Sequence, residues 1–225
     1  MTGTRAPRPE IARSRRQLLD AAEALFLRQG LEFSLNELAH EAGLGVATTY
    51  RRFASHDDVV RALHERAYAG FVAILDALDD APDGWSGVVG YLERAVAMSN
   101  AHPSYAAAAR RMARIDPASA LGQDLEPRLA AHVRRAQEEG ALRTDATAVD
   151  LVAMVAQLGV LTVLPEPART AMSARQLGFL VAGLRAESQA HGDAGEEVAA
   201  DLARLHDLAT QEPFAGRGDA GAAGG

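Results

Sequence analysis

The stretch Ser34–Phe53, SLNELAHEAGLGVATTYRRF, decides the fold of this chain, because it has the pattern of two short helices joined by a glycine turn. Ser34 followed three residues later by Glu37 is a capping box, which predicts that a helix begins at the next residue. Gly43 stands where glycine most easily adopts the left-handed backbone that ends a helix. A second helix is expected over residues 46–52. Two helices in this arrangement predict a helix-turn-helix.

The second of these helices carries side chains suited to contact with DNA. Thr48, Thr49, Tyr50 and Arg51 bring hydroxyl groups beside a guanidinium. These groups form hydrogen bonds with phosphates and base edges in the major groove, which the second helix of a helix-turn-helix enters. The alternative interpretation is an ordinary helical hairpin, whose threonines and arginines are only solvated.

The residues on both sides of this stretch are similar to the N-terminal domain of the TetR family of bacterial transcriptional regulators. The resemblance covers Arg13 to Leu63 and is carried by Leu18, Leu19, Ala21, Ala22, Leu25, Phe26, Gly30, Leu38, Ala39, Ala42, Gly43, Thr48, Tyr50, Phe53, Ser55, Asp57 and Asp58. The chain departs from the family at the start of the fourth helix, where His56 stands in place of the usual lysine. Further departures are Gly45, Ala47 and Arg52.

The resemblance implies an all-α fold, in which an N-terminal three-helix helix-turn-helix domain is followed by an α-helical ligand-binding and dimerisation bundle. We therefore expect a flexible arm over residues 1–9 and a DNA-binding domain over residues 10–55. A regulatory and dimerisation domain is expected over residues 56–211. The glycine- and alanine-rich residues 212–225 are expected to be a disordered tail.

The chain has a net charge of −7, yet its positive charge is concentrated near the expected DNA-binding helix. Residues 1–66 hold ten arginines and nine acidic residues, whereas residues 67–225 hold thirteen arginines and twenty-one acidic residues. A relatively basic N-terminal part favours contact with phosphate there. The residues expected to contact DNA are Arg13, Arg15, Ser34, Asn36, Thr48, Thr49, Tyr50, Arg51 and His56.

Helical periodicity continues through the rest of the chain. We expect a long helix over residues 57–78 with an apolar stripe on one side. The resemblance implies that this helix joins the DNA-binding domain to the body. Prolines and glycines separate it from further helices, expected over residues 85–100, 103–114, 124–139, 145–164, 173–188 and 198–209. No convincing alternating pattern predicts a strand.

Two of these later helices are apolar over wide arcs. Together with the resemblance to the TetR family and the need for paired half-sites, this predicts a four-helix interface in a homodimer, with two helices from each chain. The residues expected there are Leu151, Val155, Leu158, Thr162, Leu177, Leu180, Val181 and Leu184. The alternative is that both helices form the core of a monomer, which periodicity alone does not exclude. A dimer would place two DNA-binding helices about 34 Å apart and would bind double-stranded DNA with a (pseudo)palindromic operator.

Aromatic and methionine side chains between the joining helix and the dimer helices are candidates for a ligand cavity. They are Trp85, Tyr91, Met98, Tyr105, Met112 and Met154. The competing interpretation is that they are core residues, as aromatic and methionine residues at helical spacing often are. A ligand bound among them would act by favouring the conformation in which the DNA-binding domains are wrongly spaced.

Missing motifs argue against several other functions. The chain has no cysteine, and its seven histidines form no pair with helical metal-ligand spacing, so we expect no metal and no cofactor. No phosphate-binding loop or catalytic serine motif occurs, so we expect that the chain is not an enzyme and has no catalytic residues. No apolar run reaches the about twenty residues that cross a membrane, and no secretory signal is present, so a cytoplasmic location is expected.

These features predict a ligand-responsive homodimeric DNA-binding transcriptional regulator, a repressor released from its operator by an unknown small-molecule effector. The alternative is a helical protein-interaction module without specific DNA binding. The salt dependence of binding to duplex DNA separates the two, because each phosphate contact steepens it.

Overall fold

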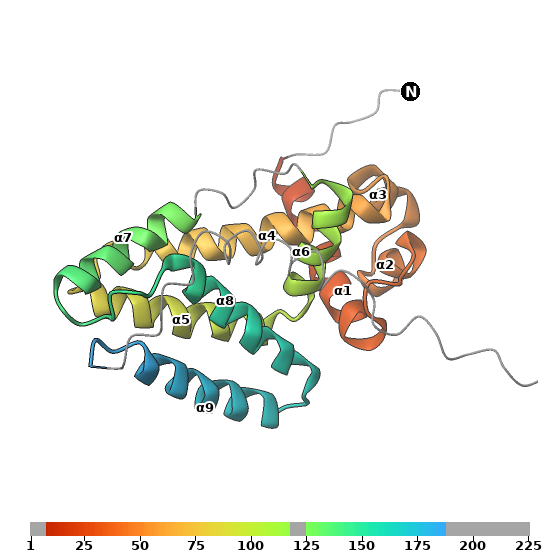
Figure 1. The fold of residues 1–225 in the computed structure, drawn as a ribbon. Coiled ribbons are helices and arrows are strands. Elements are labelled where there is room, and N and C mark those ends of the chain that lie inside the picture. The colour runs from red at the N-terminus through yellow and green to blue at the C-terminus, as the bar shows by residue number, and fades with distance from the viewer. Residues whose placement is uncertain (1–7, 118–124, 188–225) are drawn as a thin grey trace, which may run out of the picture.

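The computed structural model describes residues 8–117 and 125–187, and its first three helices form a small bundle at one end of the molecule (Figure 1). α1 spans Arg8–Gln29, α2 spans Leu35–Glu41 and α3 spans Val46–Arg52. α4, His56–Asp76, runs from this bundle into the remaining helices. We call residues 8–63 the head and the remaining described residues the body.

The body consists of the second half of α4 and the helices that follow it. α5 spans Gly84–Ala101, α6 spans Ser104–Ile115 and α7 spans Leu125–Glu138. α8, Ala148–Gly159, continues into the short 3-10 helix η1, Val160–Val163, and α9 spans Ala168–Gly183. Within the described residues the one β-type pairing is an isolated bridge between Leu142 and Arg185. The predicted all-α fold is confirmed.

The boundaries of the head helices follow from local signals in the sequence. Ser34 Oγ accepts a hydrogen bond from the backbone N–H of Glu37 at 3.1 Å, and the Glu37 carboxylate accepts one from the N–H of Ser34 at 2.7 Å. Gly43 has a φ of +63°, in the left-handed region that favours glycine. The predicted capping box, the glycine turn and the helix over residues 46–52 are therefore confirmed.

Two hydrophobic cores hold the helices together. The head core packs α1, α2 and Phe53 against the first half of α4, and it also includes Ala108 and Met112 of α6. The body core lies between α4, α5, α7, α8 and α9. α6 follows α5 in the chain but helps to close the head core, so it fixes the head to the body.

Two helices of the body differ from the expectation drawn from the sequence. The helix expected over residues 145–164 begins at Ala148, because Thr147 and Asp150 form a capping box just before it. The helix expected over residues 173–188 begins at Ala168, directly after Pro167, and ends at Gly183. Proline is tolerated at a helix start because its missing N–H would have no partner there.

Several expected segments lie outside the described residues. They are residues 1–7 of the expected arm, the helix expected over residues 198–209 and the tail expected over residues 212–225. The expected domain boundary after residue 55 falls at the start of α4, and the head core continues along α4 to Leu63. Among the helices in the described ranges, none has the length and apolarity needed to cross a bilayer.

Candidate nucleic-acid interface

α3 turns one side to solvent and the other into the head core. Tyr50 is 49% exposed, and the exposed Arg51 donates a hydrogen bond from Nη2 to Thr48 Oγ1 at 2.8 Å. Val46, one turn before Tyr50, is an exposed apolar side chain. The outer side of α3 therefore offers hydroxyl, guanidinium and apolar groups together, which is the mixture that binds phosphates and base edges.

The structure corrects the prediction for Thr49. Its side chain is 0% exposed, and its hydroxyl has no hydrogen-bond partner among the described residues. Thr49 lies one helical turn before the buried Phe53, so the helical period turns both side chains inward. Thr49 is therefore part of the head core and does not face the groove.

The two arginines predicted to contact DNA from α1 have different surroundings. Arg13 is exposed. Arg15 Nη2 lies 2.7 Å from Glu65 Oε2 of α4, and the Arg15 guanidinium lies 5.4 Å from the centre of the Phe53 ring. Arg15 is therefore engaged in holding α1 against α4, and Arg13 is the better placed of the two for a contact outside the chain.

Ser34 and Asn36 lie at the start of α2. The Ser34 hydroxyl donates a hydrogen bond to Glu37 Oε2 at 2.7 Å, so this side chain is already engaged within the capping box. The hydrogen bonds from the backbone and then the side chain of Ser34 lower the pKa of Glu37. Asn36 is exposed, so its amide is the more accessible of the two predicted contacts.

His56 begins α4, but its imidazole turns inward. The ring lies edge-on against Phe33, with ring centres 5.0 Å apart, and its Nε2 atom is buried without a hydrogen-bond partner among the described residues. An outward contact from His56 is thus left to its backbone N–H, which has no partner within the helix at this position.

Arg52 has a structural role that was not predicted from the sequence. Its Nε atom donates a hydrogen bond to Ser14 Oγ at 2.9 Å, and Ser14 donates to the carbonyl of Ile11 at 3.0 Å. These bonds join the end of α3 to α1. The helical spacing gives a signal for this contact. Arg52 follows the inward-facing Thr49 by three residues and therefore lies near the same side of the helix.

The body presents an exposed apolar surface on α8, η1 and α9, which we call the apolar face: Val152, Val160, Val163, Met172 and Phe179. The residues predicted for the dimer interface lie on the other side of the same helices. Leu151, Val155, Leu158, Leu177 and Leu184 are buried in the body core, and Leu180 and Val181 pack against it. Thr162 is half-buried and donates a hydrogen bond to the carbonyl of Gly159 at 2.7 Å. For the five buried residues the prediction is wrong, because it took the core stripe of each helix for its outer stripe.

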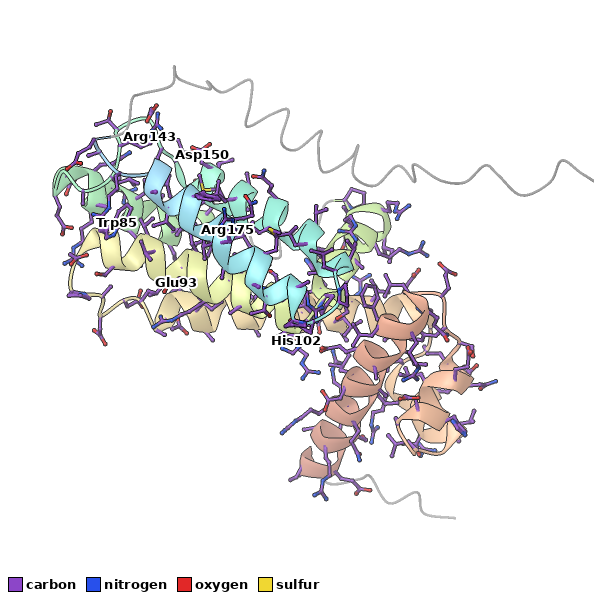
Figure 2. The ribbon with its side chains drawn as sticks, turned by 90° about the horizontal axis from the view of Figure 1, so that it is seen from below. Trp85, Glu93, His102, Arg143, Asp150 and Arg175 are labelled. Carbon is purple, nitrogen blue, oxygen red and sulfur yellow. The ribbon has the colours of Figure 1, made fainter. Side chains whose placement is uncertain are left out.

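The six side chains predicted to line a ligand cavity do not come together. Met112 belongs to the head core, and Tyr105 stacks on His102 with ring centres 4.6 Å apart. Three others lie elsewhere: Met98 beside Gly70, Trp85 with the Arg185 guanidinium 3.9 Å from its ring centre, and Met154 against the body core. In Figure 2, Trp85 and His102 lie at opposite ends of the body. Only Tyr91 lines the apolar cavity described below.

A cavity of about 260 Å³ lies between α4, α5, α7 and α8. Its lining consists of Phe71, Leu75, Tyr91, Leu125, Glu126, Leu129, Val149 and Val152. Burial raises the pKa of Tyr91 to about 12, so its hydroxyl stays protonated near neutral pH. The sequence showed the apolar stripe on α4, but the space opposite it depends on how α7 and α8 pack.

Residues 18–63 match the model of a protein family described as bacterial regulatory proteins, tetR family. This segment holds α2, α3 and the parts of α1 and α4 that pack on them. The head is therefore a TetR-family DNA-binding domain. A chain with this domain is a DNA-binding transcriptional regulator, and the head is its helix-turn-helix.

Solved structures show that the likeness to TetR-family proteins extends into the body. A TetR transcriptional regulator from Streptomyces coelicolor is 25% identical, and the match covers 77% of this chain and 99% of that chain with a TM-score of 0.58. The TetR transcription regulatory protein from Mycobacterium vanbaalenii is 21% identical over 79% of this chain and 98% of that chain, with a TM-score of 0.57. A gamma-butyrolactone receptor (ArpA-like protein) is 19% identical over 89% and 98%, with a TM-score of 0.58. No curated protein matches the chain.

Proposed function

We propose that this TetR-family chain is a ligand-responsive homodimer that acts in the cytoplasm, represses transcription and leaves its operator when a small molecule binds. The observation that carries the proposal is the outer side of α3, where Tyr50 and Arg51 point away from a head whose core is closed by α6. A head held in this way transmits a movement of the body to α3.

DNA reading is assigned to the outer side of α3. Thr48, Tyr50 and Arg51 contact base edges and phosphates, and Arg13 and Asn36 contact the backbone from α1 and α2. Arg51 is the candidate for reading a guanine, because a guanidinium binds the O6 and N7 atoms of guanine in a bidentate manner. Two heads related by a twofold axis would read the two halves of a (pseudo)palindromic operator.

Dimerisation is assigned to the apolar face on α8, η1 and α9. Phe179 is 59% exposed and Val163 is 82% exposed, although a large apolar side chain gains free energy when it leaves water. Exposed apolar residues of this kind mark sites of association when they gather on one surface. A twofold axis through the face buries the same residues of both chains and fixes the spacing of the heads.

The effector is assigned to the cavity between α4, α5, α7 and α8. Its volume of about 260 Å³ is close to the lower end of the range for small-molecule sites, about 300–1,000 Å³. Glu126 is the one charged residue among the described residues of its lining, which favours a compact ligand of low polarity. Structural neighbours described as a ketosteroid transcriptional regulator and a gamma-butyrolactone receptor support an organic effector. A ligand that displaces α4 would move the head attached to it.

The test begins with selection of bound sequences from a random duplex pool, followed by titration of the selected duplex at several salt concentrations. We expect log affinity to fall with log salt by about 0.9 for each phosphate contact. Arg51→Ala should weaken binding, whereas Arg134→Ala, which removes an exposed arginine from α7, should not. A flat salt response, or no duplex binding at low salt, would instead favour the helical protein-interaction module.

A further inference from the structure

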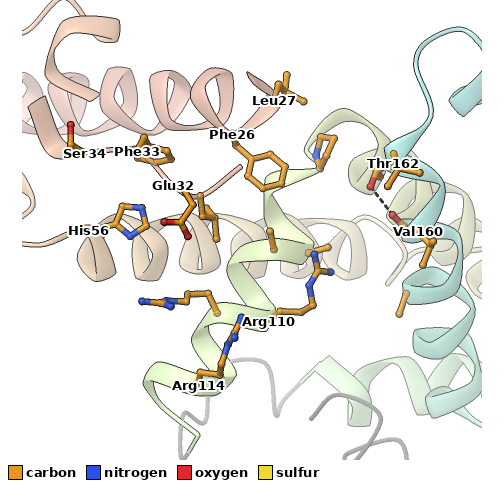
Figure 3. A pocket seen from close by; sticks show the side chains of 18 residues that line it. Phe26, Leu27, Glu32, Phe33, Ser34, His56, Arg110, Arg114, Val160 and Thr162 are labelled. Atoms are coloured by element: carbon orange, nitrogen blue, oxygen red, sulfur yellow. Dashed lines mark hydrogen bonds between the residues drawn. The ribbon is translucent and has the colours of Figure 1, made fainter. Parts of the chain in front are cut away.

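A large groove separates the back of the head from the body (Figure 3). Its volume is about 1190 Å³, and its walls come from the end of α1, the start of α4, α6, and the end of α8 with η1. In the part of the chain that the structure describes, it shares no lining residue with the apolar cavity of the body. Side chains from both the head and the body therefore face the same open space.

The α6 wall of this groove is strongly basic. Arg110, Arg111 and Arg114 all line it, and Arg111 Nη2 forms an ion pair with Asp57 Oδ1 at 3.3 Å. Arg110 and Arg114, one helical turn apart, form no ion pair or hydrogen bond with any residue that the structure describes. Among the described residues of the lining, Glu32 is the one carboxylate, so the three arginines leave a surplus of positive charge there.

The two unpaired guanidinium groups affect one another. Burial lowers the pKa of Arg110, and the charge of Arg114 lowers it further. The buried Nε2 atom of His56, which belongs to the same lining, also has no partner within the described residues. An oxyanion placed between the arginines would relieve this repulsion, because a guanidinium binds carboxylate or phosphate in a bidentate manner.

The opposite parts of the groove are apolar. Phe26 and Leu31 lie at the end of α1 and just after it, and Leu27 is 66% exposed at the rim. Val160 and Val163 approach from the body and are also exposed. Figure 3 shows Phe26 and Leu27 on the head side, Val160 on the body side and Arg110 between them. The groove thus combines a basic end with apolar walls.

We propose that this groove binds an amphiphilic organic anion, with a carboxylate or phosphate group between Arg110 and Arg114 and an apolar chain along Phe26 and Leu27. This deepens the proposed function, because it adds a second effector site with a chemistry unlike that of the apolar cavity. A molecule in the groove touches α1 and α6 at once. It therefore favours whichever angle between head and body gives it the best contact with both.

The experiment measures binding of dodecanoate and dodecyl phosphate, below their micelle concentrations and without DNA, by titration calorimetry. The double variant Arg110→Gln, Arg114→Gln should bind both at least about tenfold more weakly, because it lacks both charge-assisted hydrogen bonds. The matched control is Arg94→Gln, Arg134→Gln, which removes two exposed arginines that do not line the groove and should bind as the wild type does. Leu27→Ser should weaken the binding of dodecyl phosphate but leave the affinity for inorganic phosphate unchanged.

Binding of either amphiphile alone supports the proposal and identifies the preferred head group. Equal affinity of the wild type and the Arg110, Arg114 variant overturns it, and so does equal affinity for dodecanol and dodecanoate. If inorganic phosphate binds as tightly as dodecyl phosphate, the proposed contact between the apolar chain and the groove is overturned. A variant that loses salt-dependent duplex affinity and keeps amphiphile affinity assigns the arginines to DNA and overturns the ligand site. Since the titration contains no DNA, its outcome is independent of whether the chain binds an operator.

Discussion

His102 Nδ1 lies 2.5 Å from Glu23 Oε2, so a residue between α5 and α6 is joined directly to α1 of the head. The same carboxylate also faces α4, because Arg66 Nη1 lies 3.3 Å from Glu23 Oε1. The His102 ring stacks on Tyr105 at an angle of 9° between the planes, which holds the imidazole in place. Figure 2 shows His102 at the end of the body nearest the head. Glu23 is thus a link between the two units.

We expect this link to contribute to stability as a coupled pair. Glu23→Gln and His102→Phe should each lower the free energy of unfolding, and the phenylalanine retains a ring that can stack on Tyr105. In a double-mutant cycle the coupling between the two residues should be about 0.5–3 kcal/mol. Chemical denaturation of the four proteins measures it. A cycle with no coupling would show that the short contact does not join head and body energetically.

Thr49→Val should stabilise the head without changing its affinity for DNA. The valine has nearly the shape of the threonine but lacks the buried hydroxyl, which has no partner within the described residues. Removing an unsatisfied buried hydroxyl should raise the free energy of unfolding by about 1 kcal/mol. Arg51→Ala is the matched comparison on the outer side of α3 and should cost about 1–3 kcal/mol of operator binding if it reads guanine. Loss of operator binding in Thr49→Val would place that hydroxyl at the DNA after all.

The head could be predicted well from sequence because its signals are local. The capping box between Ser34 and Glu37 and the left-handed turn at Gly43 depend on residues within one helix and its neighbouring turn. The side of α3 that faces DNA could be predicted only in part. Thr48 and Thr49 are the same residue type, and what buries the second is the packing of α3 into the head, which the local sequence does not specify.

The body was harder to predict for a related reason. Leu151 and Val152 are adjacent apolar residues, yet the first is buried in the body core and the second is exposed. Both sides of α8 are apolar, so periodicity identifies no unique inner stripe. The choice depends on where α5 and α9 pack against α8, and α5 is distant in sequence. The apolar cavity and the groove were missed because they are spaces between helices, which no single stretch of sequence encodes.

Phe179→Glu should separate the proposed dimer. Phe179 lies on the apolar face of α9, with the Arg175 guanidinium 5.1 Å from its ring centre, and it is not part of the body core. A carboxylate buried there would weaken association by more than about 2 kcal/mol, as expected for the loss of a central aromatic residue. Analytical ultracentrifugation measures the change against the 23.8 kDa mass of one chain. Ala131→Glu, at an exposed position of α7, is the control and should leave the mass unchanged.

Gly84→Ala should destabilise the body, whereas the same change at Gly178 should not. A Cβ atom at Gly84 would lie 2.6 Å from the backbone carbon of Arg135, so α5 and α7 would have to move apart. Overpacking of this kind costs about 1–3 kcal/mol. At Gly178 no atom lies within 4 Å of the added Cβ, and alanine there should stabilise α9 by about 0.5–1 kcal/mol. In thermal denaturation, the melting temperatures of the two variants should therefore shift in opposite directions. Equal shifts would contradict this packing.

His132 should make the body less stable in mild acid. Its ring packs so closely on α5 that a Cβ atom at Gly87 would lie 2.5 Å from His132 Nδ1. Burial lowers the pKa of His132 below its ordinary value of 6.5, the nearby Arg135 and Arg128 lower it further, and Asp79 opposes them. The folded chain therefore binds this proton less readily than the unfolded chain. As the pH falls below 6.5, the unfolded state takes up the proton first, and the free energy of unfolding decreases until the folded state is protonated too. His132→Gln should remove this part of the pH dependence in denaturation curves, and an unchanged slope in the variant would assign the effect to other groups.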